Sequence, residues 1–227
     1  MYPLSAFVII HPMVEAVIFD MNGVIIDDER IHQESWRQYC QKHGFNLSEE
    51  DFTHNVFGRT EKDTFEYMYG RPITPEELET FSNERVDTAI AIYEPQIKLA
   101  DGLGRLLVGL SDLSVPLAIA TSSRRRYFDF VMSALDIGKY FQTAITAEDI
   151  MRGKPDPEIY LKAAAALGVK PEHCEGIEDT LSGIKSAQAA GMRVTAIAST
   201  HRADELLIAD RVISSFEDIS ATILLRR

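Results

Sequence analysis

The chain has 227 residues, of which 45% are hydrophobic and 26% charged, and this composition is typical of a folded soluble protein rather than a disordered one. Its 35 acidic residues outnumber the 23 lysines and arginines, which gives a net charge of -12. We therefore expect no nucleic-acid and no membrane partner, and an anionic substrate would need local positive charge at its binding site.

The beginning of the chain and its two cysteines indicate where the protein works. Residues 1–12 contain one short apolar run, which is too short to span a bilayer, and we predict that they form an N-terminal extension. Cys40 and Cys174 lie far apart, without a CxxC pair or a Cys/His cluster. This pattern indicates neither a disulfide framework nor a zinc site and favours a reducing, cytoplasmic location.

The first predicted strand is followed by a long helical region. Val14–Phe19 is a short apolar run rich in β-branched residues, which predicts a strand buried on both faces. Ser48 followed by Asp51, and Thr74-Pro75 followed by Glu76-Glu77, are typical of helix N-terminal caps. The spacing of apolar residues predicts helices over Glu29–His43, Ser48–Asn55, Glu61–Tyr69 and Pro75–Tyr93.

After Asp101-Gly102 the sequence alternates between helical and strand patterns. Strands are predicted over Pro116–Ala120, Thr143–Thr146, Cys174–Ile177, Arg193–Ile197 and Arg211–Ile213. Helical segments are predicted over Leu103–Leu113, Arg124–Leu135, Pro157–Leu167, Leu181–Ala190, Asp204–Leu207 (a single turn) and Phe216–Leu224. Such alternation requires crossover connections and a parallel sheet.

The predicted fold class is therefore α/β, with a Rossmann-like parallel sheet core and an all-helical cap domain inserted after the first strand. The core would comprise residues 13–28 and 98–227, and the cap residues 29–97. We expect the cap to lie above the carboxyl ends of the strands, where open sheets of this kind bind ligands.

Four short polar segments follow predicted strands at their carboxyl ends. They are Asp20-Met21-Asn22-Gly23, Thr121-Ser122-Ser123, Arg152-Gly153-Lys154-Pro155 and Glu178-Asp179-Thr180. Each alone is ordinary, since an Asp after a strand is usually a cap or turn former and an acidic pair is usually solvated. Together at one sheet edge they offer carboxylates for a hard cation, hydroxyls for an oxyanion and one fixed ammonium, an inventory that fits phosphoryl chemistry.

These motifs, in this order, resemble those of the haloacid dehalogenase (HAD) superfamily of hydrolases with an aspartate nucleophile. The resemblance covers nearly the whole chain from Val14 onward and is strongest to the branch with a helical cap, which includes β-phosphoglucomutase and phosphoglycolate-phosphatase-like enzymes. It implies a Mg²⁺-dependent phosphatase that acts on a small phosphorylated metabolite through an aspartyl-phosphate intermediate. We expect the protein to be a monomer or a weak homodimer.

The resemblance also implies roles at the metal and the nucleophile. Asp20 would be the nucleophile, and its carboxylate would bind Mg²⁺ together with that of Asp179 and the backbone carbonyl of Asn22. Glu178 would hold a metal-bound water, and Lys154 would bridge the nucleophile and the phosphate. Mg²⁺ and the ammonium would offset the repulsion between a carboxylate and a phosphate dianion.

Phosphate and substrate contacts are implied by the same resemblance. Thr121 and Ser122 would bind phosphate oxygens through hydroxyl and backbone N–H groups, and Ser123 would add a donor where the next helix begins. Arg59 lies in the loop between two predicted cap helices, where the family places substrate contacts.

Asn22 departs from the family pattern, which has an Asp at this position to protonate the leaving alkoxide and to deprotonate the attacking water. An amide has nearly the same shape and can do neither. The loss of such help costs about 10²- to 10⁴-fold in rate. Four explanations stay open: a substrate with a good leaving group, another proton donor, a catalytically weak protein that binds a phosphometabolite, and an engineered change.

His32, twelve residues after Asp20, is the best candidate for another donor, because imidazole titrates near neutral pH. The competing interpretation is a structural histidine in the hinge between cap and core. Asp27 and Asp28 are interpreted as hinge or N-cap residues, with capping favoured. Glu61 stands where a mutase is expected to offer a phosphate-binding arginine, which favours a phosphatase over the alternative, a β-phosphoglucomutase-like sugar-phosphate mutase.

Overall fold

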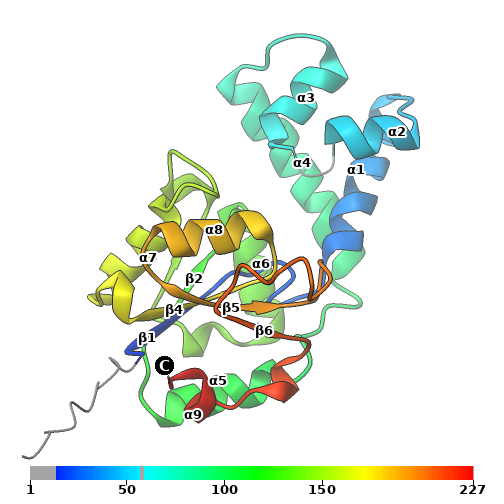
Figure 1. Cartoon of the computed structure of the whole chain (residues 1–227). Coiled ribbons are helices and arrows are strands. Elements are labelled where there is room, and N and C mark those ends of the chain that lie inside the picture. Colours follow the sequence, from blue (N-terminus) through cyan, green and yellow to red (C-terminus); the bar gives the residue numbers. More distant parts are fainter. Residues whose placement is uncertain (1–13, 57–58, 227) are drawn as a thin grey trace, which may run out of the picture.

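A six-stranded parallel sheet forms the centre of the protein (Figure 1). The computed structural model describes residues 14–56 and 59–226, so the predicted extension at residues 1–12 lies outside them. The strand order is β3-β2-β1-β4-β5-β6. The strands are β1 (Ala16–Phe19), β2 (Leu117–Ala120), β3 (Thr143–Ile145), β4 (Cys174–Glu178), β5 (Arg193–Ile197) and β6 (Arg211–Ile213). The predicted α/β class with a parallel sheet is confirmed.

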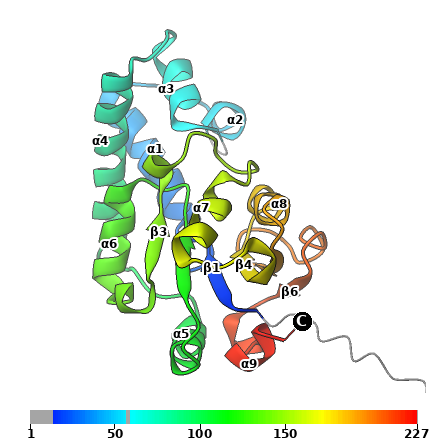
Figure 2. The ribbon, with the colours of Figure 1, turned by 90° about the vertical axis from the view of Figure 1, so that its left-hand side faces the viewer.

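Helices cover both faces of this sheet. On one face lie α5 (Leu103–Asp112), α6 (Arg125–Leu135) and α9 (Ala221–Leu224), and on the other α7 (Glu158–Leu167) and α8 (Leu181–Ala189). Figure 2 shows α6 and α8 on opposite sides of the strands. Successive residues of β1 alternate between the two cores, with Val17 and Phe19 in one and Ala16 and Ile18 in the other. All four side chains are fully buried, as the apolar run predicts.

A helical segment follows β1 and stands at one end of the sheet (Figure 1). It comprises α1 (Glu29–His43), α2 (Glu49–Asp51), a short π-helix (Phe52–Val56), α3 (Glu61–Tyr69) and α4 (Pro75–Tyr93). Its helices enclose an aromatic cluster of their own around Trp36, Tyr39 and Phe65. The predicted capping boxes at Ser48 and Thr74 are both present. We infer that this segment is the cap domain.

Three predicted helical segments differ from the structure for local reasons. The helix predicted over Ser48–Asn55 changes from α to π after Asp51, where the Thr53 hydroxyl bonds to the Glu49 carbonyl and competes with the main-chain ladder. The helix predicted over Phe216–Leu224 divides into a 3₁₀ turn (Phe216–Asp218) and α9, because the Ser220 side chain caps a new helix start. Asp204–Leu207 forms hydrogen-bonded turns rather than a helical turn.

Within residues 14–56 and 59–226, no helix combines the length and the apolar character that crossing a membrane requires.

Phe65 provides a test of the separate core of the helical segment. We expect Phe65→Ala to lower the free energy of unfolding by about 3–5 kcal/mol, because a fully buried ring would leave a cavity among packed aromatic side chains. Urea denaturation measures this change. Leu207→Ala, at a side chain that is 73% exposed, is the control and should change stability by less than about 0.5 kcal/mol. Equal effects of the two variants would contradict this account of the aromatic core.

Candidate active site

An ammonium group joins carboxylates from two neighbouring strands at the carboxyl edge of the sheet. Asp20 directly follows β1, and Glu178 is the last residue of β4, which pairs with β1. The Lys154 Nζ donates to Asp20 Oδ1 at 2.8 Å and to Glu178 Oε1 at 2.6 Å. It also donates to the carbonyl of Ala120, the last residue of β2, at 3.1 Å. The structure thus brings together Asp20, Lys154 and Glu178, which lie far apart in sequence.

The Glu178 carboxylate is held by donors on both of its oxygens. Besides Lys154, the Tyr160 hydroxyl donates to Oε1 at 2.7 Å, while Oε2 accepts the backbone N–H of Asp179 and the N–H and hydroxyl of Thr180. A Cβ at position 183 would stand 1.9 Å from this carboxylate, so Gly183 gives it room. Both Glu178 oxygens thus accept protein donors, and Glu178 is suited to orient Lys154 and to add negative charge.

Asp20, Glu178 and Asp179 form an acidic cluster that fits a hard divalent cation. One ligand oxygen from each lies within 4.8 Å of the others, and all three residues are buried. The Asp179 Oδ1 is buried without a hydrogen-bond partner among the described residues, and such an orphaned oxygen needs a cation or water. At Gly23, with φ of +70°, a Cβ would stand 2.0 Å from Asp179 Oδ2. Carboxylate oxygens are the ligands that Mg²⁺ prefers.

The protonation of these groups reflects an excess of buried negative charge. Burial raises the pKa of Asp20 to about 7, with Glu178 adding to the rise and Lys154 opposing it. Burial and the neighbouring Asp20 and Glu178 charges raise the pKa of Asp179 to about 8. Burial disfavours the Lys154 ammonium, yet the two carboxylates that it contacts outweigh this and raise its pKa. One ammonium does not balance three carboxylates, whereas a divalent cation would.

The Thr121–Ser123 loop follows β2 and borders Asn22. The buried Thr121 Oγ1 accepts the Ser123 backbone N–H at 3.0 Å and donates to Asn22 Oδ1 at 3.3 Å. The Ser123 hydroxyl donates to the same Asn22 oxygen at 2.7 Å. Ser122 is exposed. This loop therefore lies beside the segment that carries Asp20, with its hydroxyls directed at Asn22.

Asp28 does not cap α1, contrary to the sequence-based expectation. Its carboxylate is buried and turned toward the core, where Oδ2 accepts the Asn22 amide at 2.6 Å and the Tyr127 hydroxyl at 2.8 Å. His32, one turn further along α1, places Nε2 at 2.9 Å from the same oxygen and at 3.1 Å from Asn22 Nδ2. The side chains of Asn22, Asp28 and His32 thus form one hydrogen-bonded group.

Arg59 makes its polar contact within the helical segment, where its Nε donates to the His54 carbonyl at 3.1 Å. No contact between Arg59 and the acidic cluster or the Thr121–Ser123 loop is found among the described residues.

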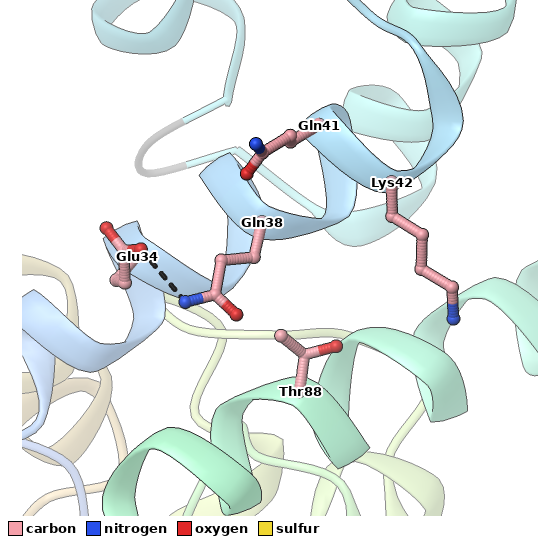
Figure 3. Close-up of a pocket in the computed structure, with 5 residues that line it drawn as sticks. All are labelled: Glu34, Gln38, Gln41, Lys42 and Thr88. Carbon is pink, nitrogen blue, oxygen red and sulfur yellow. Dashed lines mark hydrogen bonds between the residues drawn. The ribbon is translucent and has the colours of Figure 1, made fainter.

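A surface pocket lies between α1 and α4 (Figure 3), lined by Glu34, Gln38, Gln41, Lys42 and Thr88. Three of its side chains have partners nearby: Gln38 donates to Glu34 at 3.0 Å, the Thr88 hydroxyl donates to the Glu84 carbonyl at 3.0 Å, and Lys42 pairs with the Glu84 carboxylate. None of the lining residues belongs to the acidic cluster or to the Thr121–Ser123 loop, so we assign this pocket no role in the site.

Three residues that the sequence analysis did not assign to the site contact its side chains. Tyr160, from α7, holds Glu178, Thr200 donates its hydroxyl to Asp179 Oδ2 at 2.5 Å, and Asp28 binds Asn22. Tyr160 and Thr200 belong to no motif, so no local signal could have identified them. Asp28 was visible as an acidic residue near Asn22, but the direction of its side chain depends on Tyr127, which lies 99 residues away.

Comparison with known proteins agrees with this geometry. Residues 17–197 match the family model described as haloacid dehalogenase-like hydrolase. The chain therefore belongs to this family, and the resemblance of its motifs to the HAD superfamily is confirmed. The crystal structure of a HAD hydrolase (family IA, variant 3) from Entamoeba histolytica superposes with a TM-score of 0.85 at 33% identity, covering 93% of this chain and 97% of that one.

Two curated relatives have different activities. Validoxylamine A 7'-phosphate phosphatase of Streptomyces hygroscopicus subsp. limoneus is 29% identical over 215 residues, which are 91% of this chain and 96% of the relative. The β-phosphoglucomutase of Bacillus subtilis is 29% identical over 218 residues, which are 92% of this chain and 93% of the relative.

The raised pKa values predict how Mg²⁺ changes stability with pH. The folded protein retains protons on Asp20 and Asp179 that the unfolded chain releases near 3.8, so stability falls as pH rises through about 7 and 8. Mg²⁺ competes with these protons. The rise in melting temperature on adding Mg²⁺ should therefore be larger at about pH 8 than at about pH 6. Asp179→Asn should remove the rise in melting temperature that Mg²⁺ causes. An equal rise at both pH values would contradict the assignment of Asp20 and Asp179 as cation ligands.

Proposed function

We propose that the protein is a Mg²⁺-dependent phosphatase that hydrolyses a small phosphorylated metabolite through an aspartyl-phosphate on Asp20. The observation that carries this proposal is the Lys154 ammonium, held between Asp20 and Glu178 beside the unpartnered oxygen of Asp179. The family match and the phosphatase relative support it.

Asp20 is suited to attack phosphorus. Lys154 bonds to Oδ1, so the other carboxylate oxygen, Oδ2, would form the bond to phosphorus while the ester oxygen leaves with the electron pair. Lys154 keeps its proton throughout and offsets the charge of the approaching phosphate. When bound between Asp20 and Asp179, with the Asn22 carbonyl as a further ligand, Mg²⁺ would neutralise charge on the nucleophile and the phosphoryl oxygens.

The Thr121–Ser123 loop would receive the phosphoryl oxygens. The Ser122 backbone and hydroxyl are free to turn toward substrate at the exposed end of this loop, and Thr121 and Ser123 are already oriented by Asn22. Water then attacks the phosphorus of the aspartyl-phosphate and gives a proton to the neutral His32 imidazole, the bond from Asp20 to phosphorus breaks with its electron pair returning to the carboxylate, and inorganic phosphate leaves.

The leaving alkoxide needs a proton that the Asn22 amide cannot supply. We propose that His32 supplies it from Nε2, the ring nitrogen that lies beside Asn22 and Asp28, because Nδ1 faces the Arg85 guanidinium. The arrangement suggests that the carboxylate usually found at position 22 has been replaced by one at position 28, which bonds to the Asn22 amide at 2.6 Å.

Phosphatase and mutase activities differ in the fate of the phosphoryl group. A phosphatase releases inorganic phosphate, whereas a mutase returns it to another carbon of the sugar. The relatives include both activities. Glu61 favours phosphatase activity over mutase activity, because a second phosphate group on the sugar would approach a carboxylate rather than a free arginine. Release of inorganic phosphate without sugar-phosphate isomerisation is the expected result.

Exchanging the amide and the carboxylate tests the role of Asn22. The double variant Asn22→Asp/Asp28→Asn keeps one amide–carboxylate hydrogen bond but places the carboxylate two residues after the nucleophile. We expect kcat for an alkyl phosphate to rise by about 10²-fold or more, and kcat for an aryl phosphate to rise less, because a good leaving group needs little proton donation. Phosphate release measures both rates. If the exchange leaves both rates unchanged, proton donation is not what limits this site.

His32→Ala tests the proposed donor. We expect kcat for an alkyl phosphate to fall by about 10²-fold, with loss of the limb of the pH–rate profile that reports the imidazole. His54→Ala is the control, since His54 lies in the helical segment and its ring bonds to the Glu50 carbonyl. Unchanged turnover and an unchanged pH profile in His32→Ala would show that the proton comes from elsewhere.

A further inference from the structure

A cluster of three charged side chains, Arg85, Glu61 and Arg124, links the cap to the core beside the site. Arg85 lies on α4 and is 7% exposed, and its Nε and Nη2 both donate to Glu61 Oε1, at 3.1 and 2.6 Å. Arg124 precedes α6 in the core, and its Nε donates to Glu61 Oε2 at 2.9 Å. Glu61, the first residue of α3, is therefore clamped between two guanidinium groups.

This cap ion cluster adjoins the groups that surround Asn22. Arg85 Nη1 lies 3.3 Å from His32 Nδ1, on the opposite side of the ring from Asp28 and Asn22. Arg124 directly follows Ser123, whose hydroxyl donates to Asn22. The cluster therefore adjoins two residues that contact Asn22, His32 and Ser123, and the leaving group of a bound ester would extend toward it from the phosphate.

The cluster is built to keep Glu61 charged. Burial alone would raise the pKa of Glu61, but the charge of Arg85 and the hydrogen bonds from both guanidinium groups outweigh it and hold this pKa at about 2. Arg85 is fixed further by the Ser35 hydroxyl at 3.3 Å and by the Trp36 ring, whose centroid is 4.8 Å from its Cζ. Without Glu61, the buried Arg85 guanidinium would lose its carboxylate partner while Arg124 kept its pair with Glu79, which would leave a gap suited to an anion.

We propose that Glu61 is a specificity-determining residue that fills the place of a second anionic group on the substrate. The site then admits phosphate monoesters whose leaving group is uncharged, and it rejects bisphosphates and phosphorylated acids by repulsion from the permanent carboxylate. This inference rests on the proposed phosphatase activity and names the substrate class within it.

Glu61→Gln tests the proposal, because it removes the charge and retains the shape. The readouts are kcat/KM and the ligand-induced rise in melting temperature, each for fructose monophosphate and fructose bisphosphate. We expect the preference for bisphosphate over monophosphate to increase by about tenfold or more. Glu84→Gln is a matched control, since Glu84 lies in the same cap, pairs with Lys42 and His43, and has the same exposed side-chain fraction of 26%. The preference of this variant for bisphosphate over monophosphate should equal that of the wild type.

A second variant keeps the test decisive if Glu61→Gln folds poorly. In Glu61→Gln/Arg85→Gln the buried guanidinium is removed with its counter-ion, so the fold keeps its charge balance and the gain in bisphosphate preference should be smaller. If the wild type hydrolyses monophosphates and neither readout changes in Glu61→Gln, the role of Glu61 is refuted. If no form of the protein hydrolyses any phosphate ester, including an aryl phosphate, the proposed phosphatase itself is refuted.

Discussion

The structure depends on a charge imbalance at the carboxyl edge of its sheet. Lys154 contacts Asp20 and Glu178 but cannot neutralise a cluster that also contains Asp179. Burial makes this imbalance costly, and the raised pKa values of Asp20 and Asp179 express that cost. Protons or a divalent cation would each lower this cost, and a cation would do so while the carboxylates stay ionised.

A second constraint surrounds Asn22. Its amide group is satisfied on both sides, by the Asp28 carboxylate and by the hydroxyls of Thr121 and Ser123. These bonds tie the chain after β1 to the loop after β2 and to the start of α1. The same contacts that orient the site therefore also join the cap to the core.

Ion pairs supplement an apolar contact between cap and core, in which Val86, Ala89 and Tyr93 of α4 belong to the same buried cluster as Tyr127 and Val131 of α6. Arg124 pairs with Glu61 and Glu79, and Arg126 pairs with Asp87, where α4 meets α6. The core supplies the cations and the cap the anions. Most of these pairs are partly exposed and contribute little to stability, but Arg85, which also pairs with Glu61, is buried, and in the proposed function this pair faces the leaving group. Recognition and domain contact therefore share the same residues.

The sequence by itself determined the α/β class, the parallel sheet, the bounds of α1, α3 and α4, and the four polar segments at the sheet edge, because periodicity, capping and strand-end position are local properties. It also marked Asn22 as unusual. Only the tertiary structure decided that Asp28 turns inward instead of capping α1, that Tyr160 holds Glu178, and that Arg85 and Arg124 enclose Glu61. Each of these depends on side chains distant in sequence meeting in a buried place, where the cost of an unpaired polar group selects the partner.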